Sequence, residues 1–129
     1  MFWNILTSKN GAVWYFVALA LLMWLPLNGV APLDNYLFGL RADHLLHASV
    51  YLPCVYFLGR LVRSPLVVLW LLSICIGLLT ESVQWLLPFR GFDVNDLLAN
   101  AIGVTLGFLV HICLLKEKKH GKSSNQRHN

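Results

Sequence analysis

The chain contains little charge for its size. Charged residues make up 12% of its 129 residues, whereas hydrophobic residues make up 57%. The surface of a small soluble domain needs roughly a quarter charged residues, so this composition excludes an ordinary soluble enzyme or binding module. The mean hydropathy of +0.63 is instead typical of a chain whose surface faces lipid.

Cysteine motifs and catalytic loop signatures are also missing. Cys54, Cys75 and Cys113 stand singly inside hydrophobic segments, without CxxC spacing, which excludes a disulfide framework and a typical zinc site. The sequence has no glycine-rich phosphate loop and no nucleophile elbow. We therefore expect no cofactor.

A net charge of +4 would suggest nucleic acid as a partner of a soluble protein. Here half of the ten Lys and Arg residues lie between positions 116 and 127, in a polar stretch without hydrophobic anchors. Such a stretch is typical of a solvated tail near anionic lipid. We expect the bilayer, and not nucleic acid, to be the partner that this charge faces.

Long hydrophobic runs dominate the rest of the chain. About 20 residues in a helix cross a hydrocarbon core of about 30 Å, and four runs approach this length, at residues 11–30, 44–59, 65–87 and 97–115. The first run also fits a secretory signal, but Pro32 directly follows the small residues at 29–31 and should block cleavage. We predict an all-α integral membrane bundle of four transmembrane helices within residues 1–115, followed by a basic disordered cytoplasmic tail at residues 116–129.

The basic residues predict the orientation of this bundle. Lys9, Arg60, Arg63 and the tail fall on the side that holds both termini, and the other side keeps Arg41 and Arg90. Because cytoplasmic loops carry the excess of Lys and Arg, both termini are predicted to be cytoplasmic.

Polar side chains within the hydrophobic runs gather toward the predicted outer end. Glu81 lies about 10 Å inside the end of the third span, where a carboxylate costs up to about 3 kcal/mol on insertion scales. An acid at this depth is typical of a functional site, and Gln84 shares its helical face. The alternative is structural, with both side chains hydrogen-bonding neighbouring helices.

The second span carries polar residues at intervals of four. Asp43, His47 and Tyr51 share one helical face. His47 could exchange a proton near neutral pH, or it could be a core histidine satisfied by a neighbour. Asp43 equally fits a helix cap that favours the positive end of the helix dipole.

The fourth span repeats this arrangement, with Asp96 at its start and Asn100 one turn later. Asp96 again fits a helix cap. In the preceding loop, Arg90 fits either an interfacial anchor or a fork that grips a carboxylate or phosphate.

Ala99, Gly103 and Gly107 form a ladder of small residues along the fourth span. Such a ladder lets another helix approach closely, and we expect this packing to bring the start of the span against Glu81 or His47. A second hypothesis is that Gly103 and Gly107 contact a partner membrane protein.

Metal binding is not expected from the sequence. His44 and His47, together with Asp43 and Glu81, are suitable ligand types. However, the sequence contains no HExxH pattern, and His44 falls partly away from the stripe formed by Asp43 and His47.

Two stretches, ADHLLHASVY at 42–51 and ESVQWLLPFRGFDVNDLLANAIGVTLG at 81–107, resemble the VanZ-like family of small bacterial membrane proteins. In that family D-K-x-x-H-F-x-x-[YF] opens one span, and E-x-x-Q, a loop arginine and D-x-x-x-N-x-x-G-x-x-x-G carry the next two. The matching positions are Asp43, His47, Glu81, Gln84, Arg90, Asp96, Asn100 and Gly103. His44 stands where the family commonly has lysine, and Ala48 replaces its usual aromatic residue, which leaves open any role that needs a permanent positive charge at position 44.

The resemblance implies a multi-pass protein of the bacterial cytoplasmic membrane that acts in the cell envelope, since the family is associated with resistance to the glycopeptide teicoplanin. It implies no defined reaction, so whether the chain is an enzyme stays open. Our hypothesis is an outer-leaflet site that binds, and in one version modifies, a lipid-linked or cell-wall head group. Glu81 and His47 are the catalytic candidates, and the binding candidates are Asp43, Gln84, Arg90, Asp96 and Asn100.

Two other functions remain open from the sequence. One is a non-catalytic scaffold or partner subunit, whose polar cluster only locks helix packing. The other is a proton-coupled carrier, which is disfavoured because four spans enclose little pathway unless the protein oligomerises.

Overall fold

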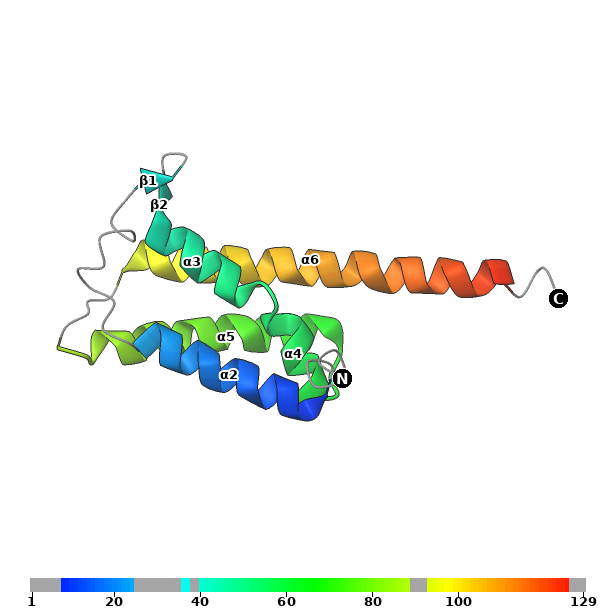
Figure 1. The fold of residues 1–129 in the computed structure, drawn as a ribbon, viewed down its shortest axis with the longest axis horizontal. Coiled ribbons are helices and arrows are strands. Elements are labelled where there is room, and N and C mark those ends of the chain that lie inside the picture. The colour runs from blue at the N-terminus through cyan, green and yellow to red at the C-terminus, as the bar shows by residue number, and fades with distance from the viewer. Residues whose placement is uncertain (1–7, 25–35, 38–39, 89–92, 126–129) are drawn as a thin grey trace.

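The computed structural model describes residues 8–24, 36–37, 40–88 and 93–125 (Figure 1). This part of the chain is helical apart from one pair of two-residue strands. The elements are α2 (Lys9–Trp24), β1 (Tyr36–Leu37), β2 (Leu40–Arg41), α3 (Ala42–Tyr51), α4 (Cys54–Leu61), α5 (Leu66–Trp85) and α6 (Val94–Asn125). The strands pair antiparallel, with Tyr36 opposite Arg41 and Leu37 opposite Leu40.

Proline and aspartate set the ends of the two longest helices. Pro65 precedes α5 with φ −55° and ψ 147°, and its carbonyl accepts the first helical hydrogen bond from Leu69 N at 3.1 Å. At the start of α6, Asp93 Oδ1 accepts a hydrogen bond from Asn95 N at 2.8 Å. That bond satisfies a backbone donor that has no partner within the helix.

The predicted second span at 44–59 is not one helix. It is divided into α3 and α4 at Leu52 and Pro53, because proline has no N–H to donate and its ring clashes with the preceding turn. The break removes the helical donor for nearby carbonyls. One of them, Val50 O, accepts a hydrogen bond from Tyr15 Oη at 2.8 Å. A side chain of α2 therefore donates a hydrogen bond to a carbonyl of α3 beside the break.

The helices form a bundle in which α3 lies along the first part of α6, and α5 packs against the same helix (Figure 1). Gly103 and Gly107 make the α3 contact possible. A Cβ atom at these positions would lie 2.1 Å from Ala48 O and 1.8 Å from Leu52 O. The small-residue ladder therefore packs against α3 of the same chain, and a partner protein at these glycines stays a prediction.

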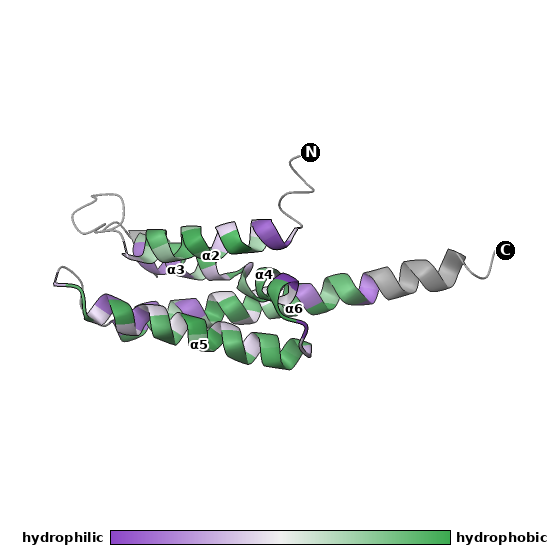
Figure 2. Cartoon of the chain, turned by 90° about the horizontal axis from the view of Figure 1, so that it is seen from below, coloured by the Kyte–Doolittle hydropathy of each residue, from purple (hydrophilic) through white to green (hydrophobic). Residues whose placement is uncertain are grey.

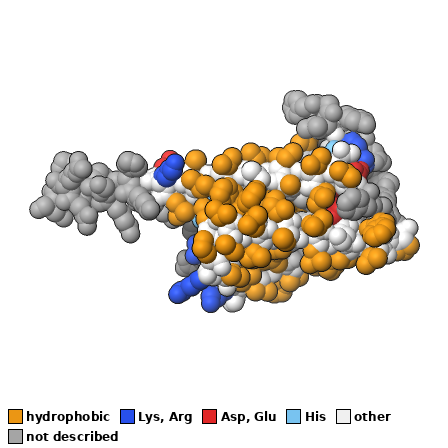
Figure 3. Space-filling model, turned by 180° about the vertical axis from the view of Figure 1, so that it is seen from behind, with side chains coloured by type: hydrophobic (Ala, Val, Ile, Leu, Met, Phe, Trp, Pro, Cys, Tyr) orange, Lys and Arg blue, Asp and Glu red, His pale blue; other side chains and the backbone are white. Residues whose placement is uncertain are grey.

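The molecule buries polar residues and exposes hydrophobic ones. Leu79 and Ile102 are 64% and 56% exposed, whereas Glu81 and Asn100 are 0% and 1% exposed. Hydrophobic residues run along most of α2 and α5 (Figure 2). On the face shown in Figure 3, hydrophobic side chains cover the middle and charged side chains gather toward the two ends. This distribution suits a bundle whose surroundings are lipid, since lipid imposes no need for a polar surface.

Two helices of the described residues are long and apolar enough to cross a membrane. They are α5, which has 20 residues, and Val94–Glu117 of α6, which has 24 residues; the mean hydropathy of an 18-residue window reaches 2.2 in the first and 2.1 in the second. They correspond to the third and fourth predicted spans. The prediction of four spans with cytoplasmic termini goes further than these two helices, and the end of the first predicted span lies outside the described residues.

The helix that contains the fourth predicted span, α6, is longer than predicted. It continues beyond Leu115 to Asn125, through most of the segment that the sequence predicts to be a disordered tail. In Figure 1 this part of α6 extends away from the other helices.

Candidate functional site

Four buried polar residues of α3 and α6 meet at one end of the bundle, and we call them the α3–α6 cluster: Asp43, His47, Asp96 and Asn100. Both helices begin at this end, and α5 ends there (Figure 1). Asp43 and His47 are one turn apart on α3, as are Asp96 and Asn100 on α6, so each pair shares a helical face. Close packing of the two helices places these faces against each other.

His47 is at the centre of the cluster. Its side chain is 1% exposed, and Nδ1 lies 2.8 Å from Oδ1 of Asn100. An amide oxygen only accepts hydrogen bonds, so the imidazole donates through Nδ1. Its other nitrogen, Nε2, lies 3.8 Å from Oδ1 of Asp43 and 3.9 Å from Oδ2 of Asp96, and it has no hydrogen-bond partner among the described residues.

Neither aspartate of the cluster is a helix cap, contrary to the alternative that the sequence allowed. Arg41 occupies the N-cap position of α3 and makes no side-chain cap bond, and Asp93 makes the capping bond of α6. Asp43 and Asp96 lie in the first turns of their helices. There a negative charge interacts favourably with the helix dipole and the side chains can still point into the cluster.

Two residues that were not among the predicted site residues, Arg41 and His44, lie beside the cluster. Arg41 NH2 lies 3.6 Å from Asp43 Oδ2, and Arg41 NH1 lies 3.9 Å from Asp93 Oδ2. His44 Nε2 lies 3.5 Å from Asp96 Oδ1. The pairing of Arg41 could not be read from the sequence because it depends on the position of β2, which pairs with β1 and leads directly into α3.

Glu81 is buried where α5 ends and α6 begins. Its Oε1 accepts a hydrogen bond from Asp93 N at 3.1 Å. The carboxylate therefore links the third predicted span to the start of the fourth, next to the α3–α6 cluster, through the same residue that caps α6.

The other two predicted site residues are not placed in the cluster. Gln84 is buried and donates from Nε2 to the carbonyl of Met23, near the end of α2. This contact corresponds to the structural alternative for Gln84, because it joins two helices. Arg90 lies outside the described residues.

A second set of buried polar residues on α5 escaped the sequence analysis. Thr80 hydrogen-bonds Tyr51 across the bundle and also donates to Gly77 O at 2.9 Å, and Ser73 is fully buried. With Glu81 and Gln84, these residues follow one face of α5 at helical spacing. The missed signal was this run of small and polar residues within a hydrophobic segment.

Two groups of three side chains have ligand atoms within 4.8 Å of one another and could hold a metal ion. One consists of Asp43, His47 and Asp96 and is buried; the other consists of His44, Asp93 and Asp96 and is partly exposed. The ligand types considered from the sequence were Asp43, His44, His47 and Glu81, and Asp96 was not among them, although the start of the fourth span was expected to pack against Glu81 or His47.

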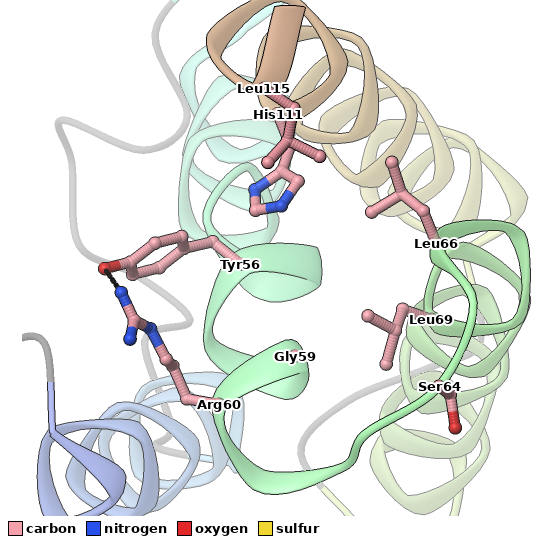
Figure 4. A pocket seen from close by; sticks show the side chains of 8 residues that line it. All are labelled: Tyr56, Gly59, Arg60, Ser64, Leu66, Leu69, His111 and Leu115. Carbon is pink, nitrogen blue, oxygen red and sulfur yellow. Dashed lines mark hydrogen bonds between the residues drawn. The ribbon is translucent and has the colours of Figure 1, made fainter. Parts of the chain in front are cut away.

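A cavity of about 440 Å³ lies at the opposite end of the bundle, between α4, the start of α5 and the later part of α6 (Figure 4). Arg60 and Tyr56 lie at its edge and share a hydrogen bond of 2.9 Å. Its lining includes none of the predicted site residues. The polar residues predicted to carry function and this cavity are therefore separate features of the fold.

Comparison with known proteins gives one match. A family model described as VanZ/LLP1 matches residues 11–116, a range that includes every element from the first turn of α2 to the apolar part of α6. No curated protein and no solved structure matches the chain.

Proposed function

Because the chain belongs to the VanZ/LLP1 family, which is linked to antibiotic resistance, we propose that it is a multi-pass protein of the bacterial cytoplasmic membrane that binds a lipid-linked or cell-wall head group. The binding site is the α3–α6 cluster together with Glu81. In this proposal both termini are cytoplasmic and the cluster lies at the outer leaflet, where such head groups are exposed.

The burial of several ionisable side chains together carries the proposal. Asp43, His47, Glu81 and Asp96 are all buried at the same end of the bundle. Charged groups in a membrane helix bundle are costly and usually mark a ligand or ion site. Packing alone would be satisfied more cheaply by small or neutral side chains.

The chemistry of the cluster suits a ligand with hydroxyl, amide or ammonium groups, because carboxylates accept hydrogen bonds from all three. Arg41, with a side chain that is 37% exposed, adds a guanidinium fork at the edge of the cluster that fits a phosphate. Where the head group is also modified, Glu81 and His47 are the side chains that can transfer a proton.

The test compares lipids that copurify with the wild-type chain and with Glu81→Gln. The glutamine side chain retains an oxygen that can accept from Asp93 N, so this variant removes the charge while it keeps the hydrogen bond that links α5 to α6. Glu117→Gln, an exposed position on α6, is the matched control. We expect mass spectrometry to find a head group that is present with wild type and Glu117→Gln and lost with Glu81→Gln.

Teicoplanin susceptibility of cells that produce the same three proteins gives a second measurement. Glu81→Gln should abolish any tolerance that the wild-type chain confers, at unchanged abundance in the membrane. Equal lipid profiles and equal tolerance for all three proteins would refute the head-group site.

A non-catalytic scaffold is the second candidate, and the bonds made by Gln84 and Glu81 favour it. Gln84 joins α5 to α2, and Glu81 joins α5 to α6, so part of the buried polarity holds helices together. Under this function Glu81→Leu, which removes the acceptor for Asp93 N, should lower the abundance of the protein in the membrane, whereas Glu81→Gln, which keeps that acceptor, should leave both the abundance and the lipid profile unchanged.

A further inference from the structure

We propose that the α3–α6 cluster binds a divalent transition-metal ion, with His47 Nε2 and the carboxylates of Asp43 and Asp96 as its protein ligands. The three side chains come from two helices and are buried together. This site goes beyond head-group binding and does not depend on it.

The distances within the cluster fit a shared ion better than a hydrogen-bonded network. His47 Nε2 is 3.8 Å and 3.9 Å from the two carboxylate oxygens, whereas a hydrogen bond between nitrogen and oxygen spans about 2.7–3.2 Å. Two ligand atoms that are each about 2.0–2.2 Å from one ion lie roughly 3.3–3.6 Å apart in tetrahedral coordination and cannot lie more than about 4.4 Å apart. The observed separations of 3.8 Å and 3.9 Å are below this limit.

The orientation of His47 provides an independent indication. Its Nδ1–H is directed to Asn100 Oδ1 at 2.8 Å, so in the neutral imidazole the lone pair is on Nε2. This buried lone pair points at two carboxylates and has no donor among the described residues. A cation bound between the nitrogen and the two carboxylates would use all three groups as ligands.

Asn100 is a positioning residue in this proposal. Histidine ligands almost always donate their second ring nitrogen to an oxygen acceptor, which fixes the tautomer and the ring orientation. Asn100 provides that acceptor from α6, one turn after the ligand Asp96. Both halves of the site are therefore held by the close packing of α3 on α6.

The charge of the surroundings also favours a cation. Asp43, Asp93 and Asp96 bring three carboxylates to this end of α3 and α6. Among the described residues within ion-pair distance of these carboxylates, one, Arg41, carries a permanent positive charge. A divalent ion would add positive charge next to these three carboxylates.

The ligand set narrows the choice of ion. One imidazole nitrogen and two carboxylate oxygens, without a thiolate, suit Zn²⁺ and Mn²⁺. Three protein ligands leave at least one coordination position for water or another oxygen. The sequence analysis expected no metal because no ligand motif is contiguous, and the structure assembles the site from two separate segments.

The experiment measures metal content and coordination in the purified full-length chain in detergent. After loading with Zn²⁺ or Mn²⁺ and removal of excess ion, we expect about one ion per chain by elemental analysis, as in a single three-ligand site. With Mn²⁺, pulsed electron paramagnetic resonance should show coupling to one imidazole nitrogen.

Three variants and one control identify the ligands. His47→Gln and Asp96→Asn should lose the bound ion, and Asn100→Leu should weaken its affinity about 10-fold to 100-fold, as expected for a positioning residue. His111→Gln, a histidine of α6 outside the cluster, should bind as wild type does. Asp96→Asn keeps the size and shape of the side chain, so we expect the fold to be kept. A size-exclusion profile like that of wild type checks this expectation.

Two results would overturn the site: a wild-type chain that retains no more ion than Asp96→Asn, or a nitrogen coupling that persists in His47→Gln. The lipid profile of Glu81→Gln is a separate measurement. Loss of the metal proposal therefore leaves head-group binding to stand or fall on its own test.

Discussion

At the scale of single residues, the buried polar side chains divide into two groups by the contacts that they make. Gln84, Thr80 and Tyr51 form hydrogen bonds that join neighbouring helices. His47 instead faces carboxylates at distances longer than a hydrogen bond. The first arrangement stabilises the bundle, whereas the second leaves unused binding capacity in its interior. The buried polar side chains therefore have two roles, stabilising the bundle and binding a ligand, and substitutions can separate these roles.

Gln84→Leu tests the stabilising group. Leucine keeps the volume of the side chain and removes the donor to Met23 O, which lies in the last turn of α2. We expect a loss of about 1–2 kcal/mol in the free energy of unfolding, because a buried hydrogen bond between helices is broken. Detergent-denaturation titration of the purified chain measures this quantity.

Ser82→Ala is the control for Gln84→Leu, since the Ser82 hydroxyl donates to Leu78 O of its own helix at 2.8 Å and so joins no two helices. It should change stability little. If Gln84→Leu lost the copurified head group and kept wild-type stability, Gln84 would be a binding residue and our structural assignment would be wrong.

The sequence could predict which polar residues face the bundle but not all of their partners. Helical spacing put Asp43 and His47 on one face and Asp96 and Asn100 on another, and the structure brings these faces together. Spacing could not show that Gln84 reaches α2, because that contact depends on the packing of a third helix. It also could not identify Asp93 as the cap of α6, since helix ends cannot be located to within one or two residues from sequence.

At the scale of elements, the contact between α3 and α6 holds the cluster. The backbone at Ala48 and Leu52 lies directly on Gly103 and Gly107. The chain changes from α3 to α4 at Pro53, just after this contact. The glycines of α6 and the end of α3 therefore form one interface. Any side chain added to this face of α6 must move α3 and with it His47.

Gly107→Ala tests this interface. The added Cβ would lie 1.8 Å from Leu52 O, a backbone atom, so the helices must separate. We expect the free energy of unfolding to fall by about 2 kcal/mol or more, as overpacking of a rigid contact does. Thermal unfolding in detergent provides the measurement.

Gly59→Ala is the matched control for Gly107→Ala. Its Cβ would lie 3.1 Å from Cδ1 of Leu69, a side-chain atom that can move, and alanine also favours the helix by up to about 1 kcal/mol. Its stability should stay within about 1 kcal/mol of wild type. Equal stability of Gly107→Ala and Gly59→Ala would show that α3 does not rest on α6 as the structure has it.

The course of the second hydrophobic run marks the limit of sequence analysis at this scale. Hydrophobicity predicted one span at 44–59, a run that includes Pro53. The run is divided at Pro53, and Tyr15 of α2 donates to Val50 O beside the break, a contact between residues 35 positions apart that hydrophobicity cannot show. The third and fourth predicted spans correspond to α5 and to the apolar part of α6.

At the scale of the whole molecule, the exterior is hydrophobic between two ends that carry the charges (Figure 3). One end holds the α3–α6 cluster and Arg41, and the other holds Arg60, in the last turn of α4, and Arg63 just after it. Hydrophobicity predicts such a band but not which end faces the cytoplasm. Orientation depends on the distribution of Lys and Arg, so it requires a direct test.

A single cysteine at position 92 provides that test. In a background where the three native cysteines are replaced by alanine, Phe92→Cys should react in intact cells with a membrane-impermeant thiol reagent, because the loop that follows α5 is predicted to face outward. Ser123→Cys, beyond the apolar part of α6, should react only after the cells are opened. Gel mobility after labelling measures both reactions. The reverse pattern would place the polar cluster at the cytoplasmic leaflet, where a cell-wall head group on the outer surface could not reach it.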